Sequence, residues 1–107
     1  MSKLINGRFS FKKTHTGNLL GEFSNNLNEG VFTESADLCE TIDGFEGTYK
    51  TTWQESGSAM ICDLSIKKKY TKSNNIYTLI WSDSSGIKFT GEAMIFDNIL
   101  IGDYKNK

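Results

Sequence analysis

The chain of 107 residues contains no proline, a single histidine and only two cysteines. A small secreted scaffold usually carries more cysteines at regular spacing, so a disulfide framework is not expected. The sequence also lacks a run of roughly 18 apolar residues that could span a membrane, and its first residues do not form the apolar stretch of a signal peptide. These absences favour a reducing cytoplasm with Cys39 and Cys62 as free thiols, and a single disulfide between them is the alternative.

Motifs of known chemistry are missing as well. A serine triad would depend on His15, the only histidine, which falls in a predicted turn. The sequence contains no Gly-x-Ser-x-Gly elbow, no zinc-ligand spacing and no phosphate-binding glycine loop. The sequence therefore favours a non-catalytic protein without a cofactor or a metal.

Positive charge is missing from a long internal segment, because residues 14–49 contain neither lysine nor arginine. That segment holds seven acids, which are Glu22, Glu29, Glu34, Asp37, Glu40, Asp43 and Glu46. Such a run commonly marks a solvated surface. The alternative is a protein-binding adaptor, inhibitor or immunity-type protein, whose acidic face over residues 22–46 binds a basic partner through Glu34, Asp37 and Glu40. The net charge of −1 gives no general attraction to nucleic acid or to an acidic membrane, so neither is expected as a partner.

What the chain does contain is a series of short runs rich in β-branched and aromatic residues. Residues 48–53 and 59–67 alternate between apolar and polar side chains, which is typical of strands with one buried face. Further strands are predicted at residues 4–12, 19–24, 30–33, 76–81, 87–96 and 99–104. Residues 72–75 have turn composition, and Asp97-Asn98 suits a two-residue hairpin turn with positive φ.

Residues 33–42 are ambiguous. Phe32, Ala36 and Cys39 are spaced as on one face of a helix, so a short helix is predicted there, with a distorted strand as the alternative. A regular strand would place Glu34 and Glu40 on the same face as the apolar residues, which would bring charge into the core.

These elements predict one all-β domain over residues 1–107, an antiparallel meander of about eight strands that closes into a small barrel. A two-sheet sandwich is the alternative. Small barrels are either filled by their own side chains or hold one small ligand.

The second half of the chain carries a resemblance to a known group of folds. Its pattern runs G-T-Y-x-x-x-W, I-Y-x-L-x-W, F-x-G-x-A-M and L-I-G-x-Y. Over residues 45–104 this pattern resembles the calycin-like small β-barrels, which include lipocalin-like and streptavidin-like domains of bacterial proteins. The resemblance implies a β-barrel.

Two spaced pairs of aromatic residues form the candidate ligand site. Tyr49 and Trp53, and likewise Tyr77 and Trp81, are four residues apart and therefore share a strand face. We expect them to line a wall for a small apolar or aromatic ligand at the barrel mouth or interior, with Arg8 as a polar anchor, and ordinary core packing is the alternative. Exposed aromatic strand edges also leave a homodimer open.

Glycines interrupt several of the predicted strands. LLGEF places Gly21, and LIGDY places Gly102, inside an apolar run. A glycine within a strand marks a bend, or a place where a large side chain lies against bare backbone.

Overall fold

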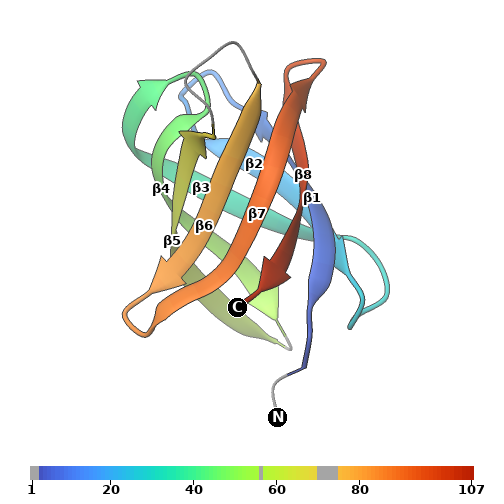
Figure 1. Ribbon diagram of the computed structural model, residues 1–107. Coiled ribbons are helices and arrows are strands. Elements are labelled where there is room, and N and C mark those ends of the chain that lie inside the picture. Colours follow the sequence, from blue (N-terminus) through green and yellow to red (C-terminus); the bar gives the residue numbers. More distant parts are fainter. Residues whose placement is uncertain (1–2, 56, 70–74) are drawn as a thin grey trace.

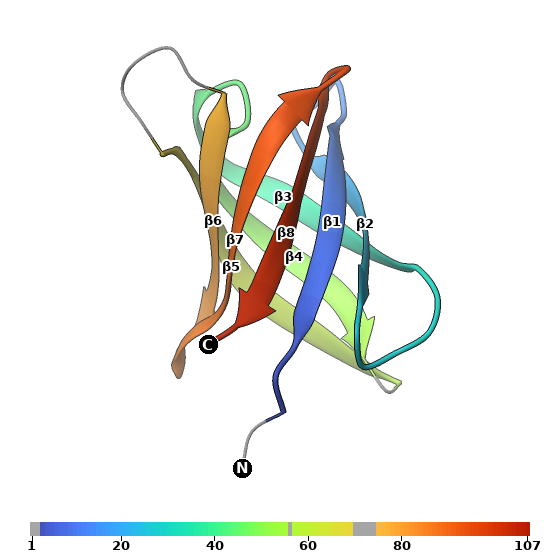
Figure 2. The ribbon, with the colours of Figure 1, turned by 45° about the vertical axis from the view of Figure 1, so that its right-hand side comes forward.

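The computed structural model describes residues 3–55, 57–69 and 75–107, which form a closed antiparallel β-barrel (Figure 1). Its strands are β1 (Asn6–Lys13), β2 (Leu19–Asn25), β3 (Phe32–Asp43), β4 (Glu46–Glu55), β5 (Ser58–Lys68), β6 (Ile76–Asp83), β7 (Gly86–Phe96) and β8 (Ile99–Asn106). Each strand pairs with the next, and β1 pairs with β8, beside which it lies in Figure 2. The predicted eight-stranded meander is confirmed, and it forms a barrel and not a sandwich.

Side-chain alternation places the core inside this barrel. In β4 the residues Tyr49, Thr51 and Trp53 are buried, whereas Lys50 and Thr52 are exposed. The buried apolar side chains come from all eight strands and from the β3–β4 turn: Phe9, Phe11, Leu19, Ala36, Phe45, Tyr49, Trp53, Cys62, Leu64, Ile66, Tyr77, Leu79, Trp81, Ala93, Leu100 and Tyr104. Aromatic residues supply eight of these sixteen, which compensates for the modest apolar content of so short a chain.

The helix predicted over residues 33–42 is wrong. These residues belong to β3, and the described part of the chain contains no helix. The strand pairs with β2 on one side and β4 on the other, so a helix here would leave both neighbours with unpaired edges. It is the distorted strand of the alternative interpretation, because its register with β4 shifts between Leu38 and Glu40 and again between Thr41 and Asp43.

Tight turns join several strands. Asp97 and Asn98 have φ of 53° and 65°, which confirms the predicted hairpin turn between β7 and β8. The turn predicted over residues 72–75 lies largely outside the described residues. None of the described segments forms a helix able to cross a membrane.

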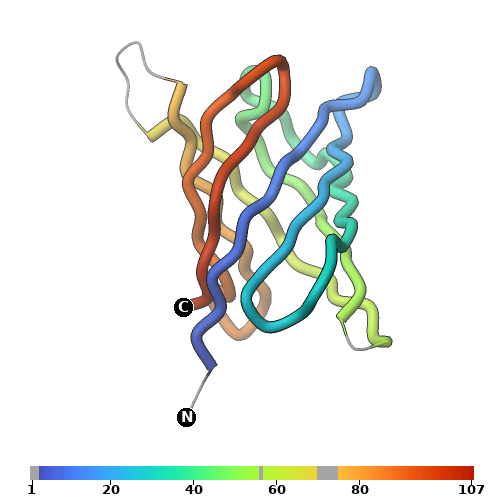
Figure 3. Tube along the Cα trace, turned by 90° about the vertical axis from the view of Figure 1, so that its right-hand side faces the viewer, coloured from blue at the N-terminus to red at the C-terminus, as the bar shows by residue number. Residues whose placement is uncertain are grey.

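The two ends of the barrel differ. The β1–β2, β3–β4 and β7–β8 connections lie at one end, while both chain termini lie at the other (Figure 1). The β2–β3 connection lies at the same end as the termini (Figure 3). We call this second end the termini end.

Candidate functional site: an aromatic cup at the termini end

A cavity of about 30 Å³ lies within the termini end of the barrel. Its lining residues are Ile5, Phe9, Phe23, Asn25, Glu34, Trp53, Glu55, Trp81, Phe89 and Tyr104. Six of these ten are aromatic, and they come from β1, β2, β4, β6, β7 and β8. We call this set of ten residues the aromatic cup.

The rings of the cup hold one another in edge-to-face contacts. Phe89 lies between the two tryptophans, with its centroid 6.2 Å from that of Trp53 and 6.5 Å from that of Trp81. Its plane makes angles of 67° and 89° with those two rings. Phe9 meets Trp81 at 5.5 Å and 81°, and Tyr104 meets Phe89 at 5.5 Å and 86°. Such tilted contacts are the preferred geometry of aromatic pairs, so they fix the shape of the wall.

Glu34 is the charged residue buried inside the cup, with only 6% of its surface exposed. Its Oε2 atom accepts a hydrogen bond of 2.5 Å from the Thr51 hydroxyl and another of 2.9 Å from the Trp81 indole N–H. Among the described residues, none donates a hydrogen bond to the other oxygen, Oε1. No buried side-chain nitrogen or oxygen among the described residues lacks a hydrogen-bond partner, so Oε1 is open to the cavity and can accept a further hydrogen bond there.

Burial raises the pKa of the Glu34 carboxyl above its ordinary value of 4.5, and the hydrogen bonds from Thr51 and Trp81 act in the opposite direction. Burial removes water from the charged carboxylate, and the free energy lost in this way exceeds the stabilisation that the two hydrogen bonds to Oε2 provide.

Negative charge extends from Glu34 toward the rim of the cup. Glu55 is exposed there, and Asn25 donates a hydrogen bond of 3.1 Å to the Tyr104 hydroxyl. Burial raises the pKa of Tyr104, the Asn25 hydrogen bond lowers it, and the charges of Glu34 and Glu55 raise it further. Among the described residues that line the cup, none is lysine, arginine or histidine.

The mouth of the cup is formed by three half-buried apolar side chains, those of Ile5, Phe23 and Phe89. Backbone contacts hold the first of them in place. The Ile5 N–H donates to the Asn106 side chain at 2.9 Å, and the Asn106 N–H donates to the Ile5 carbonyl at 3.1 Å. The mouth can therefore widen by rotation of side chains while the backbone of the two terminal segments stays paired.

The predicted ligand-binding residues divide between the two ends of the barrel. Trp53 and Trp81 line the cup. Tyr49 and Tyr77 are also buried inside the barrel, but neither lines the cup, and the Tyr49 hydroxyl donates to the Phe45 carbonyl at 2.8 Å, beside the β3–β4 turn. Arg8 is exposed, because the neighbouring Phe9 points inward, so the barrel interior does not receive the predicted anchor.

The predicted acidic face also divides. Asp37 and Glu40 are exposed on β3, whereas Glu34 points into the barrel and is not part of a surface. Its role as an interior group was missed in the sequence interpretation, as were the positions of Phe23, Phe89 and Tyr104. The alternation of Glu34, Ala36 and Leu38 was the available signal, and it was set aside because it brought charge into the core.

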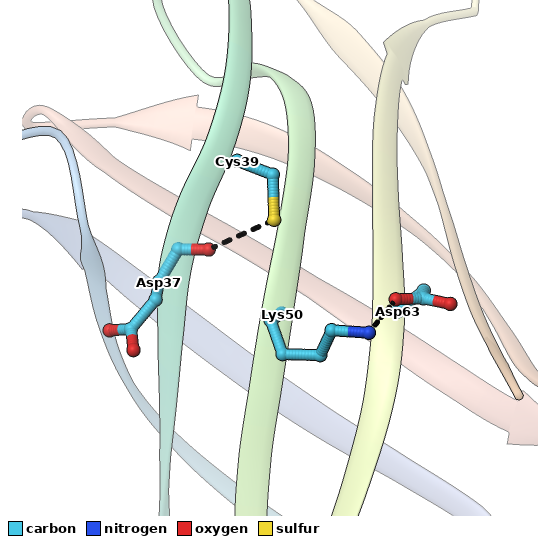
Figure 4. A network of polar contacts seen from close by, with 4 residues as sticks. All are labelled: Asp37, Cys39, Lys50 and Asp63. Atoms are coloured by element: carbon cyan, nitrogen blue, oxygen red, sulfur yellow. Dashed lines mark hydrogen bonds and ion pairs between the residues drawn. The ribbon is translucent and has the colours of Figure 1, made fainter.

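The outer face of β3, β4 and β5 carries a row of polar side chains (Figure 4). Lys50 pairs with Asp63 at 2.5 Å, and the Cys39 thiol lies 3.9 Å from the Asp37 carbonyl. Exposed pairs of this kind contribute little to stability. Both cysteines are free thiols, with Cys39 exposed and Cys62 buried. Within the described residues, no group of three or more His, Cys, Asp or Glu side chains could hold a metal ion.

Comparison of the chain with protein-family models, with curated proteins and with solved structures finds no match. The resemblance to calycin-like barrels therefore stays a prediction, and the function must be inferred from the cup itself.

Ionisation of Glu34 should make the barrel less stable as pH rises. Since its folded-state pKa lies above the unfolded value of about 4.5, its contribution is complete below pH 4.5 and is lost as pH rises through the folded pKa. The slope should reach at most about 1.4 kcal/mol per pH unit. Thermal and urea unfolding between pH 4.5 and neutrality, compared with Glu34→Gln, should show a flatter profile for the variant.

Two controls show that a difference in pH dependence between the wild type and Glu34→Gln comes from the Glu34 carboxyl. Asp37→Asn removes an exposed acid from the same strand and should retain the wild-type slope. The other groups near the cup with raised pKa, Cys62 and Tyr104, titrate above the measured range. A Glu34→Gln profile parallel to that of the wild type would show that this carboxyl does not change its proton occupancy on folding.

Proposed function

We propose that the protein is a non-catalytic binding protein that takes a small apolar or aromatic molecule into the aromatic cup. One observation carries the proposal: six aromatic rings surround a cavity whose buried carboxylate has an oxygen without a donor. Ligand sites in proteins typically combine a concave apolar lining with a few convergent polar groups.

The size of the cavity defines how a ligand would enter. A volume of about 30 Å³ has room for roughly one or two water molecules, so it accommodates only one small group of a ligand. The remainder of the ligand would displace the half-buried side chains of Phe23 and Phe89 at the mouth. The rings of Phe23 and Phe89 would then pack on the body of the ligand instead of on the aromatic residues of the cup that they contact now.

A simple packed core explains the cup less well. At the other end of the barrel, the Tyr49 hydroxyl has its acceptor and Phe45 closes the turn. In the cup, a carboxyl group lies among aromatic rings with one oxygen open to the cavity, an arrangement that a core packed only for stability does not need. A ligand that donates to this oxygen would complete the hydrogen bonding of the carboxylate.

Titration with phenethyl alcohol, a neutral aromatic probe, tests the proposal through the fluorescence of Trp53 and Trp81. We expect a saturable change, and a native mass spectrum of the purified protein should show whether a molecule is already bound. Phe89→Leu should weaken binding about threefold to tenfold, since it removes the ring that contacts both tryptophans.

Tyr77→Phe is the matched control for that variant, because Tyr77 is a buried aromatic residue outside the cup. It should leave the affinity unchanged. An absence of any saturable change with this probe and with its cationic and anionic analogues, with a native mass equal to that of the bare chain, would rule out the proposal.

A further inference from the structure

We propose that the ligand of the aromatic cup carries a primary ammonium group, which Glu34 binds as its counter-ion, on an apolar or aromatic body. This inference rests on the proposed function, since it names the class of molecule that the cup takes. Three features of the cup carry it: its charge, the geometry of its one buried carboxylate, and its size.

The charge of the cup favours a cation. Its ionisable lining residues are Glu34, Glu55 and Tyr104, and no described lining residue is basic. An anionic ligand would meet two acids without a compensating positive charge, which is unfavourable in a partly dehydrated site. A cation would instead supply a partner for Glu34, whose pKa is raised by burial. Aromatic ring faces add to this preference, because they attract cations within about 6 Å of their centroids.

The geometry of Glu34 favours a donor of hydrogen bonds. Thr51 and Trp81 both donate to Oε2, so the free acceptor is Oε1. An ionised carboxylate has no hydrogen to offer, and whatever binds Oε1 must provide one. A primary ammonium carries three N–H donors, whereas a quaternary ammonium carries none. The unused oxygen therefore selects a protonated amine over a quaternary cation.

Cavity size points the same way. The cavity of about 30 Å³ admits a group of roughly the size of a water molecule. An ammonium group meets this limit, while a trimethylammonium group exceeds it severalfold. The apolar body of such an amine would lie toward the mouth, against Ile5, Phe23 and Phe89.

Three probes of nearly equal shape separate charge from apolar contact in the intact wild-type chain. They are phenethylamine, phenethyl alcohol and hydrocinnamate, which are respectively a cation, a neutral molecule and an anion at neutral pH. We expect phenethylamine to bind about tenfold to hundredfold more tightly than the alcohol, the range for a hydrogen bond to a charged group. Hydrocinnamate should bind most weakly. Isothermal titration calorimetry and tryptophan fluorescence measure the three affinities.

Variants of two acids on β3 identify the counter-ion. Glu34→Gln keeps the size of the side chain and an acceptor for Trp81 but removes the charge, so it should abolish the preference for the amine over the alcohol. Asp37→Asn removes an exposed charge from the same strand and should keep the preference. Circular dichroism confirms the fold of each variant, and the probe series on the wild type holds if Glu34→Gln fails to fold.

The outcomes distinguish this inference from the proposed function. Equal affinities for the amine and the alcohol would overturn the ammonium assignment and leave the cup a site for neutral aromatic molecules. A retained preference in Glu34→Gln would overturn the role of Glu34. If none of the three probes binds and the native mass is that of the bare chain, both proposals fail together.

Discussion

Replacing Gly102 with alanine should lower the free energy of unfolding by about 3 kcal/mol or more. A Cβ atom at this position would lie 2.0 Å from the carbonyl oxygen of Glu92 and 2.7 Å from the Cα of Ala93. Both atoms belong to the backbone of β7, so no side-chain rotation can relieve the contact. The β7–β8 pair, in which Gly102 lies opposite Ala93, would have to separate. Because a barrel has no free edge, that separation would strain the neighbouring pairs as well.

Urea unfolding, followed by circular dichroism and by tryptophan fluorescence, measures this loss. Gly44→Asn is the control, because Gly44 has φ of 56° and its Cβ would meet no atom within 4 Å. Asparagine tolerates that left-handed conformation, so its variant should stay within about 1 kcal/mol of the wild type. A Gly102→Ala variant as stable as Gly44→Asn would show that the two strands are not in such close contact.

Features of the fold that depend only on residues close together in the sequence were predictable. Alternation in β4 and β5 follows from the two-residue period of a strand, which needs no knowledge of the partner. The Asp97-Asn98 turn is local as well, since its requirement is positive φ at two adjacent positions. The number and spacing of the strands favoured a barrel but left a two-sheet sandwich as the alternative.

The assignment of β3 could not be reached in this way. Its inward-pointing Glu34 is satisfied by Thr51 and Trp81, which lie 17 and 47 positions further along the chain. A local interpretation sees only a charge on an apolar face and favours a helix. The strand becomes acceptable once β4 and β6 deliver their donors, which is a tertiary effect that overrides local preference.

The candidate site was predictable only in part, for a related reason. Residues Trp53 and Trp81 were identified as part of an aromatic wall, because their strand face could be deduced. Strand stagger decides which end of the barrel an inward-pointing side chain reaches. Trp53 and Tyr49 both point inward from β4, but Trp53 lines the cup and Tyr49 lies beside the β3–β4 turn. The outward direction of Arg8 was deducible from its alternation with the inward-pointing Phe9.

Replacing Phe11 with alanine should lower the free energy of unfolding by about 3–5 kcal/mol, the usual loss for a fully buried phenylalanine. Phe11 has no exposed surface, and its ring lies across Gly21 on β2, where a Cβ would be 2.6 Å from two ring carbons. The glycine of LLGEF is therefore a place where a large side chain covers bare backbone. Phe96→Ala is the matched control, because Phe96 is 68% exposed and its loss should change stability by less than about 0.5 kcal/mol.

A double-mutant cycle tests whether that ring is what requires the glycine. Gly21→Ala alone should cost about 1–3 kcal/mol, because the new methyl group overlaps the Phe11 ring. In the Phe11→Ala background the overlap disappears, and the remaining contact is the Ser10 carbonyl oxygen at 3.0 Å. The second substitution should then cost much less, which gives a coupling energy in the range of about 0.5–3 kcal/mol found for residues in contact. Simple addition of the two single losses in urea unfolding would mean that Gly21 is required by the bend of β2 and not by Phe11.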